Sequence, residues 1–192
     1  LIPNTQYLIP NTHYIELQSV YFYVEKIQLI NSHQMTEFSK ECMREAIRFS
    51  KQNISDGSGG PFGAVIAKDG KIIAGASNKV TSSNDPTAHA EIEAIREACR
   101  KLNTFSLAGC EIYTSCEPCP MCLSAIHWAR IEKIYYANTR RDAAEIHFDD
   151  EIIYNEVAKS VDDRIIPMIQ LLNDEAKKVF VEWKEKEDKI HY

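Results

Sequence analysis

Apolar side chains recur at helical and strand-like spacing from residue 36 onward. Phe38, Cys42 and Ala46 lie four residues apart, as on one face of a helix, and they predict a helix near 36–52. A run rich in glycine and proline at 57–61 ends this helix. The regular part of the chain therefore begins with an amphipathic helix.

A β-hairpin and a second helix are predicted next. Apolar runs at 62–68 and 71–77 flank an Asp-Gly pair at 69–70, which is typical of tight hairpin turns. The second helix begins after Asp-Pro-Thr at 85–87. Its larger apolar residues are predicted to face the core: Ile92, Ile95, Cys99 and Leu102.

A strand at 111–114, a helix from about 120 to 130 and a strand at 133–137 complete the pattern. This alternation of strands and helices after a hairpin predicts a three-layer α/β domain with parallel strands. The tail from about residue 149 is predicted to be more helical, with a charged helix at 174–188 near its end.

Residues 1–34 differ from the rest of the chain. They begin with a near-perfect repeat, since Leu1–Tyr7 and Leu8–Tyr14 differ at a single position. The first 25 residues contain no Lys or Arg, which excludes a basic signal or transit peptide. We expect this segment to be an extension outside the enzyme fold, with Met35 as the natural start of a domain at 35–192.

The composition is that of one ordinary globular domain. Of 192 residues, 44% are hydrophobic and 26% are charged, and the formal net charge is −6. Proteins that bind nucleic acids usually present a basic face to the phosphates, so this acidic balance favours a small-molecule substrate. No apolar run reaches the roughly 20 residues that cross a bilayer, and we expect no membrane partner.

The six cysteines indicate metal chemistry rather than disulfides. Cys116, Cys119 and Cys122 lie three residues apart, a spacing that suits metal ligands. Cys42 and Cys99 fall on apolar faces of predicted helices, where free buried thiols are expected. Unpaired thiols fit a reducing compartment, so the expected location is the cytoplasm.

Two short motifs carry the chemistry: His-Ala-Glu at 89–91 and Pro-Cys-Pro-Met-Cys at 118–122. One histidine nitrogen and two cysteine sulfurs fill three corners of a zinc tetrahedron and leave the fourth for a water. Each motif lies at the start of a predicted helix, where free N–H groups and the helix dipole stabilise negative charge. This combination is typical of zinc deaminases of bases and predicts zinc at His89, Cys119 and Cys122.

Glu91 favours a catalytic zinc site over the alternatives. A closed structural site could use Cys116 as its fourth ligand, and the evenly spaced cysteines also resemble part of an iron–sulfur run whose fourth cysteine is missing. A structural zinc site has no need of a carboxylate beside its histidine. Glu91 is therefore predicted to be an acid and base that does not bind the metal.

Three stretches, Gly59–Val65, Asp85–Glu91 and Thr114–Cys122, resemble the cytidine-deaminase-like guanine deaminases. The similarity covers about four-fifths of the chain. It implies a three-layer α/β/α cytidine-deaminase-like fold with a mixed central sheet of about five strands. It also implies that the C-terminal helical segment, about 150–192, is domain-swapped in a homodimer.

The resemblance also implies a role for individual residues. His89, Cys119 and Cys122 would hold one zinc ion per subunit. Glu91 would move protons between water, a ring nitrogen and the departing amine, and a second acid would assist at the exocyclic amine. The implied substrate-binding residues include this second acid, Asp150, and a terminal tyrosine that enters the neighbouring subunit's site: Phe62, Asn78, Ala90, Trp128, Asp150 and Tyr192.

The predicted activity is the hydrolysis of guanine to xanthine and ammonia, as in purine catabolism. A tRNA adenosine deaminase would share the zinc motifs, but it needs basic clusters, and the tail at 184–189 mixes Lys with Glu and Asp. Deamination of guanosine or cytosine stays open, because one pocket residue can decide between a base and a nucleoside. The alternative from another class is a non-catalytic zinc-binding module, from which release of ammonia would distinguish an enzyme.

Overall fold

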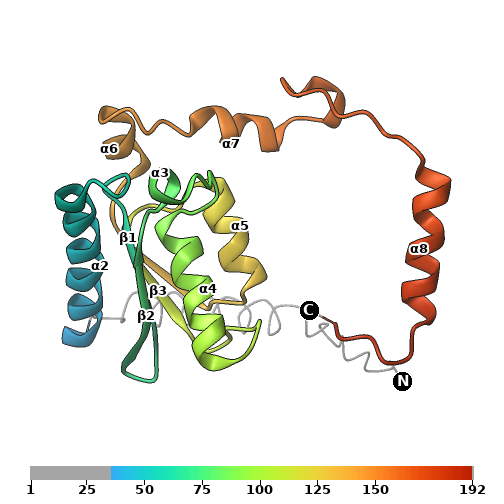
Figure 1. The fold of residues 1–192 in the computed structure, drawn as a ribbon. Coiled ribbons are helices and arrows are strands. Elements are labelled where there is room, and N and C mark those ends of the chain that lie inside the picture. The colour runs from blue at the N-terminus through green and yellow to red at the C-terminus, as the bar shows by residue number, and fades with distance from the viewer. Residues whose placement is uncertain (1–35, 192) are drawn as a thin grey trace, which may run out of the picture. The chain divides into compact units, whose positions relative to one another are not determined.

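The computed structural model describes residues 36–191. The chain divides into two units, residues 1–40 and 41–192, and helix α2 (Glu37–Asp56) begins in the first and continues in the second. The expected extension at 1–34 lies outside the described residues. The central sheet and the other described helices belong to the second unit (Figure 1).

Four strands form the sheet in the described part of the chain: β1 (Gly63–Lys68), β2 (Lys71–Ser77), β3 (Glu111–Cys116) and β4 (Lys133–Asn138). Their order is β2-β1-β3-β4, and β1 runs antiparallel to both of its neighbours while β3 runs parallel to β4. Asp69 and Gly70 have φ angles of 49° and 71°, the left-handed pair that a two-residue hairpin turn of type I′ requires. The predicted hairpin is therefore confirmed.

The sheet is mixed, as predicted, and the strands that follow the hairpin run parallel to one another; it differs from the prediction in strand number. The hairpin reverses the chain within two residues, so β1 is antiparallel to β2. Helix α4 (Ala90–Leu102) then connects β2 to β3, which lies on the other side of β1 and runs parallel to β2. Within residues 36–191 the sheet has four strands, not five. After β4 the chain enters helices, and the segment around Pro167 stays unpaired, since proline has no N–H for a strand ladder.

Helices cover both faces of the sheet, with α2 on one face and α4 and α5 (Pro120–Trp128) on the other (Figure 1). Helix α2 packs closely because two strand residues have no Cβ. A Cβ at Gly63 would overlap the carbonyl oxygen of Ala46, and one at Gly75 would overlap the ring of Phe49. The structure therefore has the predicted three layers.

Helix α4 contacts the sheet through small side chains. Ala90, Ala94 and Ala98 are fully buried and lie four residues apart, so the helix can approach β1 and β2 closely. The prediction for the larger apolar side chains is confirmed in part: Ile95 and Cys99 are partly buried and pack against the core, whereas Ile92 is partly buried outside this cluster and Leu102 is exposed. These three alanines, here called the alanine stripe, form the fully buried face because the helix lies close to the sheet. The larger side chains lie on the flanks of the helix.

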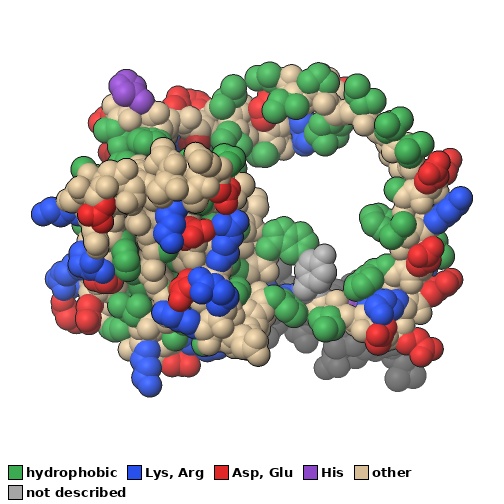
Figure 2. Space-filling view, viewed as in Figure 1, with side chains coloured by type: hydrophobic (Ala, Val, Ile, Leu, Met, Phe, Trp, Pro, Cys, Tyr) green, Lys and Arg blue, Asp and Glu red, His purple; other side chains and the backbone are tan. Residues whose placement is uncertain are grey.

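The remaining helices follow β2 and β4: α3 (Val80–Ser83), α6 (Arg140–Glu145), α7 (Glu151–Ala158), the 3₁₀ helix η1 (Val161–Asp163) and α8 (Asn173–Glu185). The predicted charged tail helix is confirmed as α8. No side chain of α7 or α8 is buried, and hydrophobic side chains line the exposed C-terminal segment (Figure 2). In the described residues, no helix combines the length and the apolar character needed to cross a bilayer.

The cysteines, all of which lie in the described residues, are free thiols. Cys42 is fully buried, as predicted, whereas Cys99 is partly exposed. Cys116 and Cys122 are also buried, and Cys119 is partly exposed. The last two lie at the start of α5, which leads to the site.

Candidate active site

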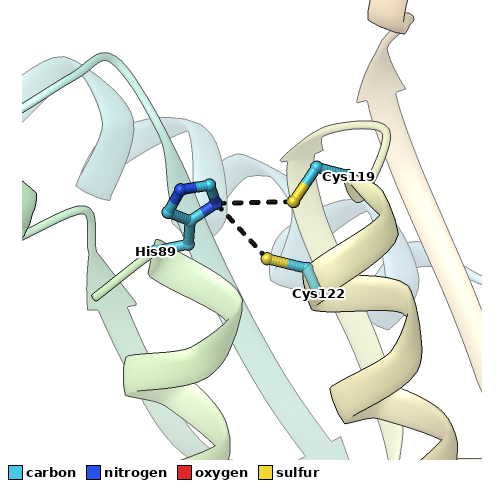
Figure 3. A group of neighbouring side chains, drawn as sticks. All are labelled: His89, Cys119 and Cys122. Atoms are coloured by element: carbon cyan, nitrogen blue, oxygen red, sulfur yellow. Dashed lines mark hydrogen bonds between the residues drawn. The ribbon is translucent and has the colours of Figure 1, made fainter. Parts of the chain in front are cut away.

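Three side chains from the starts of two helices point toward one another (Figure 3). His89 is the residue that precedes α4, Cys119 is the residue that precedes α5, and Cys122 lies in the first turn of α5. His89 and Cys119 have extended backbone angles, as N-cap residues usually do. The two helices therefore bring together the His and Cys residues that the motifs predict.

The spacing of the three donor atoms fits a zinc ion. The Sγ atoms of Cys119 and Cys122 lie 3.6 Å and 3.5 Å from Nδ1 of His89. Zinc–sulfur bonds of about 2.3 Å and zinc–nitrogen bonds of about 2.0–2.1 Å, at the tetrahedral angle, hold sulfur and nitrogen about 3.5 Å apart. These residues would hold the metal through one imidazole nitrogen, Nδ1, and two sulfurs.

The alternative of a closed site with a fourth cysteine does not fit the geometry. Among the described residues, the group that could hold a metal consists of His89, Cys119 and Cys122. The thiol of Cys116 instead donates to the carbonyl oxygen of Thr139, at 3.5 Å, and burial raises the pKa of this thiol to about 11. Three protein ligands leave the fourth position to a small molecule, as in catalytic zinc sites.

The electrostatics of the cluster favour a thiolate at Cys119. A hydrogen bond from Cys122 lowers the pKa of Cys119 to about 4, and the interaction with His89 adds to this effect. The same interactions raise the pKa of Cys122, which keeps its proton, and the contact with Cys119 raises the pKa of His89. A cation at this point would replace the proton that Cys122 holds, since thiolates are the form that binds metals.

Glu91 lies beside the cluster without belonging to it. Its side chain is 7% exposed, and its Oε2 accepts a hydrogen bond from the thiol of Cys122 at 3.5 Å. Burial raises the pKa of this carboxyl, and the negative charge of Cys119 raises it further. A raised pKa makes the carboxylate a stronger base, which favours the uptake of a proton from a neighbouring group.

A cavity of about 460 Å³ opens beside the cluster. Its lining includes most of the predicted site residues: Phe62, Asn78, His89, Glu91, Cys119 and Asp150. Cavities of about 300–1,000 Å³ are typical for small-molecule ligands. The structure thus brings together, at one cavity, residues from five separate parts of the sequence.

Asn78 is held rigidly at the cavity. It is 5% exposed, and its Oδ1 accepts a hydrogen bond from the N–H of Val80 at 3.1 Å. Asn53 donates to its backbone carbonyl at 2.9 Å, and Gly59 lies so close that a Cβ there would be 2.6 Å from this carbonyl oxygen. Because Oδ1 is used locally, the amide nitrogen is the side-chain atom best placed to donate to a ligand.

Two aromatic rings meet at the cavity wall. Phe62 and Phe148 pack edge to face, with ring centroids 4.9 Å apart and an angle of 89° between the planes. Phe148 was not predicted as a site residue, although it directly precedes the acidic pair at 149–150. Gly60 lies 3.2 Å, measured from an ideal Cβ, from both rings, so a larger residue there would crowd the wall.

Asp150 reaches the cavity from the start of α7, where it is the N-cap residue. Partial burial raises the pKa of its carboxyl, and the charge of Cys119 has the same effect, while Arg140 acts in the opposite direction. Arg140 and Glu117 also line the cavity. Glu117 lies within the stretch Thr114–Cys122, although no role was predicted for it, and no motif in the sequence points to Arg140.

The remaining predicted residues lie elsewhere. Ala90 is fully buried in the first turn of α4 and is not among the residues that line the cavity. Trp128 is 69% exposed and lines a different groove, between α4 and α5, together with Ile92, Ile95 and Phe105. Tyr192 lies outside the described residues. The structure therefore does not bring Trp128 to the cavity of the same chain.

Comparisons with known proteins agree with this site. The family model of the cytidine and deoxycytidylate deaminase zinc-binding region matches residues 36–138. The guanine deaminase of Bacillus subtilis is 49% identical over 150 residues, which are 78% of this chain and 96% of that protein. The X-ray structure of guanine deaminase from Bacillus subtilis superimposes with a TM-score of 0.78 and 48% identity, over 80% of this chain and 98% of that one.

A tRNA-specific adenosine deaminase from Aquifex aeolicus is 50% identical over 101 residues, but these are 52% of this chain and 63% of that protein. The matched family region contains the three metal-binding residues and the glutamate beside them. The chain belongs to the family of zinc-dependent deaminases that share the cytidine and deoxycytidylate deaminase zinc-binding region.

Proposed function

We propose that the protein is a zinc-dependent guanine deaminase, a hydrolase that converts guanine and water into xanthine and ammonia. The observation that carries this proposal is the extent of the similarity. It covers nearly the whole length of the Bacillus guanine deaminase, in sequence and in structure, whereas the tRNA-specific relative matches about half of this chain. The cavity beside the metal-binding residues supports a small substrate.

His89, Cys119 and Cys122 hold one zinc ion per chain in this proposal. When bound, zinc acts as a Lewis acid that lowers the pKa of a water toward about 7 and so supplies a nucleophile at neutral pH. The helix N-termini at His89 and Cys119 add partial positive charge around the same point. The two helices therefore contribute ligands and a favourable field together.

Glu91 is the proton carrier. Its carboxylate takes a proton from the attacking water and passes it to the purine ring nitrogen next to C2. The carboxyl then delivers the second proton of that water to the exocyclic nitrogen, which leaves as ammonia while the C2 oxygen becomes a carbonyl. The hydrogen bond from Cys122 and the burial of Glu91 hold the carboxyl close to the metal-binding atoms through both steps.

The other cavity residues bind and orient the base. The amide nitrogen of Asn78 donates to an acceptor of the purine, and the carboxylate of Asp150 accepts from an N–H or from the exocyclic amine. Phe62, supported by Phe148, provides a flat apolar wall for the ring. Three contacts of different kinds fix the orientation of a planar substrate.

The active form is proposed to be a homodimer in the cytoplasm. The apolar groove that contains Trp128 and the exposed apolar residues of the C-terminal segment need a covering surface. A second copy of the chain would supply it, with Tyr192 reaching the neighbouring cavity and Trp128 covered at the contact. Free cysteines fit a reducing compartment.

The face of the molecule shown in Figure 2 mixes Lys and Arg with Asp and Glu. This pattern does not favour a polyanionic substrate, which needs clustered positive charge. Guanosine and cytosine are the stronger competitors, because the cavity volume alone does not separate a base from a nucleoside.

An ammonia-release assay over a panel of substrates tests the proposal. The zinc-loaded protein is incubated with guanine, guanosine, adenine, cytosine, cytidine and a tRNA anticodon stem-loop. We expect guanine to give the highest kcat/KM, with one zinc ion per chain by metal analysis. Activity on the RNA alone would overturn the proposal. A higher kcat/KM with guanosine would mean that the substrate is the nucleoside and not the base.

A further inference from the structure

Helix α7 carries Asp150 to the cavity but has no buried face of its own. Its side chains Ile152, Ile153 and Val157 are 58%, 43% and 62% exposed. Packing of a hydrophobic face, which holds most helices in place, is therefore weak here. The position of Asp150 must depend on a few specific contacts.

Tyr154 makes the best defined of these contacts. It is partly buried, one turn after Asp150, and its hydroxyl donates to the carbonyl oxygen of Pro118 at 3.3 Å. Pro118 and Pro120 flank the zinc ligand Cys119, and neither has an N–H to tie this loop to its surroundings. The hydroxyl of Tyr154 thus links α7 to the loop that presents a metal ligand.

Arg140 holds Tyr154 from the other side. The carbon of its guanidinium group lies 4.6 Å from the centroid of the Tyr154 ring, within the range of a cation–π contact. Its backbone N–H donates to Oε2 of Glu117 at 3.1 Å, and the N–H of Glu117 donates to the carbonyl of Asn138 at 2.8 Å. Arg140 is therefore anchored to the same loop, just before Pro118, and to the end of β4.

We propose that Arg140 and Tyr154 form a clamp that positions Asp150 relative to the Cys119 loop, so that the base-binding acid and the metal site keep one spacing. Both act through Asp150 as positioning residues: Tyr154 lies outside the cavity lining, and Arg140 contributes to the lining beside Asp150. The inference rests on the proposed function only for the role of Asp150. The clamp itself stands on the contacts among α6, α7 and the loop.

Arg140 has a second effect, on the charge of Asp150. The charged groups that act on this carboxyl include Arg140, Asp149 and Cys119. The other charged or titratable groups near it are Tyr154 on its own helix and four residues of the cavity lining: His89, Glu91, Glu117 and His147. Arg140 is the cation whose charge lowers the pKa of Asp150, against the burial and negative charges that raise it. Removing its charge should therefore raise that pKa further.

Three variants of the zinc-loaded, full-length protein test the clamp. Tyr154→Phe removes only the hydroxyl, Arg140→Met removes the charge and keeps an apolar stem, and Arg140→Lys keeps the charge. Matched controls are Tyr136→Phe on β4 and Arg141→Met, which change exposed residues outside the cavity lining. All variants are measured for zinc content, kcat and KM with guanine, the pH profile of kcat/KM and hydrogen exchange.

We expect Tyr154→Phe to keep its zinc and to lose about 10- to 100-fold in kcat/KM, the size of effect that a small misplacement causes. Exchange of the amides at 150–158 should become about 5-fold faster, as loss of one hydrogen bond of about 1 kcal/mol implies. The acidic limb of the pH profile of kcat/KM should move to higher pH in Arg140→Met. In Arg140→Lys it should lie at the wild-type position. Both controls should match the wild type.

Unchanged kcat/KM and exchange in Tyr154→Phe would overturn the clamp. A general loss of activity with an unmoved pH profile in Arg140→Met would also overturn the role of Arg140. Such a result would mean that Arg140 supports the fold and does not act on Asp150. If the wild-type protein does not act on guanine, the proposed function fails, and faster exchange at 150–158 in Tyr154→Phe still supports the contact. The two failures are therefore distinguishable.

Discussion

At the scale of single residues, the site is built from groups whose surroundings change their proton affinity. Burial raises the pKa of Glu91, and the thiol of Cys122 donates to its carboxyl. In the same cluster the pKa of Cys119 falls to about 4, because Cys122 and His89 stabilise its thiolate. Stability alone would not select a buried carboxyl at this place, so its position supports a role in proton transfer.

Replacing Glu91 with glutamine keeps the size of the side chain and removes its ability to take a proton. We expect Glu91→Gln to bind one zinc ion per chain and to lose about 10²- to 10⁴-fold in kcat. Metal analysis and steady-state kinetics measure the two quantities. Glu97→Gln, on the same helix but outside the cavity lining, should behave like the wild type. Near-normal turnover of Glu91→Gln would refute the assigned role.

Cys42 makes stability depend on pH. It is fully buried, and burial, assisted by Glu41 and Glu111, raises the pKa of its thiol from 9.0 to about 11. The folded state holds this proton more tightly, so the stabilising contribution is complete below pH 9.0 and is lost as the pH rises toward about 11. The free-energy advantage of the wild type over Cys42→Ala should shrink by about 2–3 kcal/mol across that window. Urea unfolding at both pH values checks this, and a constant difference would contradict it.

At this scale the sequence predicts the residues whose spacing is local. His89 and Glu91 are two residues apart, and Cys119 and Cys122 are three apart, so one helix turn suffices to place each pair. Phe148, Arg140 and Tyr154 carry no such signal. Their contacts join segments that only the fold brings together.

At the scale of elements, the alanine stripe of α4 determines how the site is supported. Ala90, Ala94 and Ala98 let the helix lie close to the sheet, and the same helix begins at His89. The sequence pattern predicts the helix and the inward positions of Ile95 and Cys99, but it misses the alanines that form the fully buried face. Hydrophobicity alone does not predict this buried face, because the short distance between helix and sheet leaves room only for small side chains.

Overpacking this contact should destabilise the domain. Ala94 is fully buried between helix and sheet, and we expect Ala94→Leu to lower the free energy of unfolding by about 1–3 kcal/mol. Ile92→Leu, on the flank of the same helix, should have a much smaller effect, since it conserves volume. Denaturant unfolding of the two zinc-loaded variants makes the comparison. Equal effects would mean that the alanine stripe is not the tight contact.

At the scale of the whole molecule, the C-terminal segment presents more apolar surface than a lone chain can cover. On α8, Val179, Phe180 and Trp183 are 61%, 76% and 44% exposed. Large exposed apolar patches of this kind mark interaction surfaces. Together with the groove at Trp128, they are the observations that support a second copy of the chain as the partner.

A charge on this surface should weaken the dimer. We expect sedimentation equilibrium to give a dimer for the wild type and a shift toward monomer for Phe180→Asp. Lys178→Asp, on the same helix, introduces the same side chain at a charged position and serves as the control. If the wild type sediments as a monomer at micromolar concentration, or if both variants stay dimeric, the apolar surface of α8 is not the dimer contact.

The sequence by itself determined which His and Cys residues form the group that could hold a metal, the glutamate beside them, the hairpin and the order of helices and strands. These depend on spacings within one turn or one helix, which neighbouring residues enforce. The tertiary structure decided what depends on distant segments. It set the strand order β2-β1-β3-β4, the alanine face of α4, the cavity shared by Asn78, Phe148 and Asp150, and the contacts of Tyr154 with Pro118 and Arg140. Such contacts follow from close packing across the whole domain, which no local pattern records.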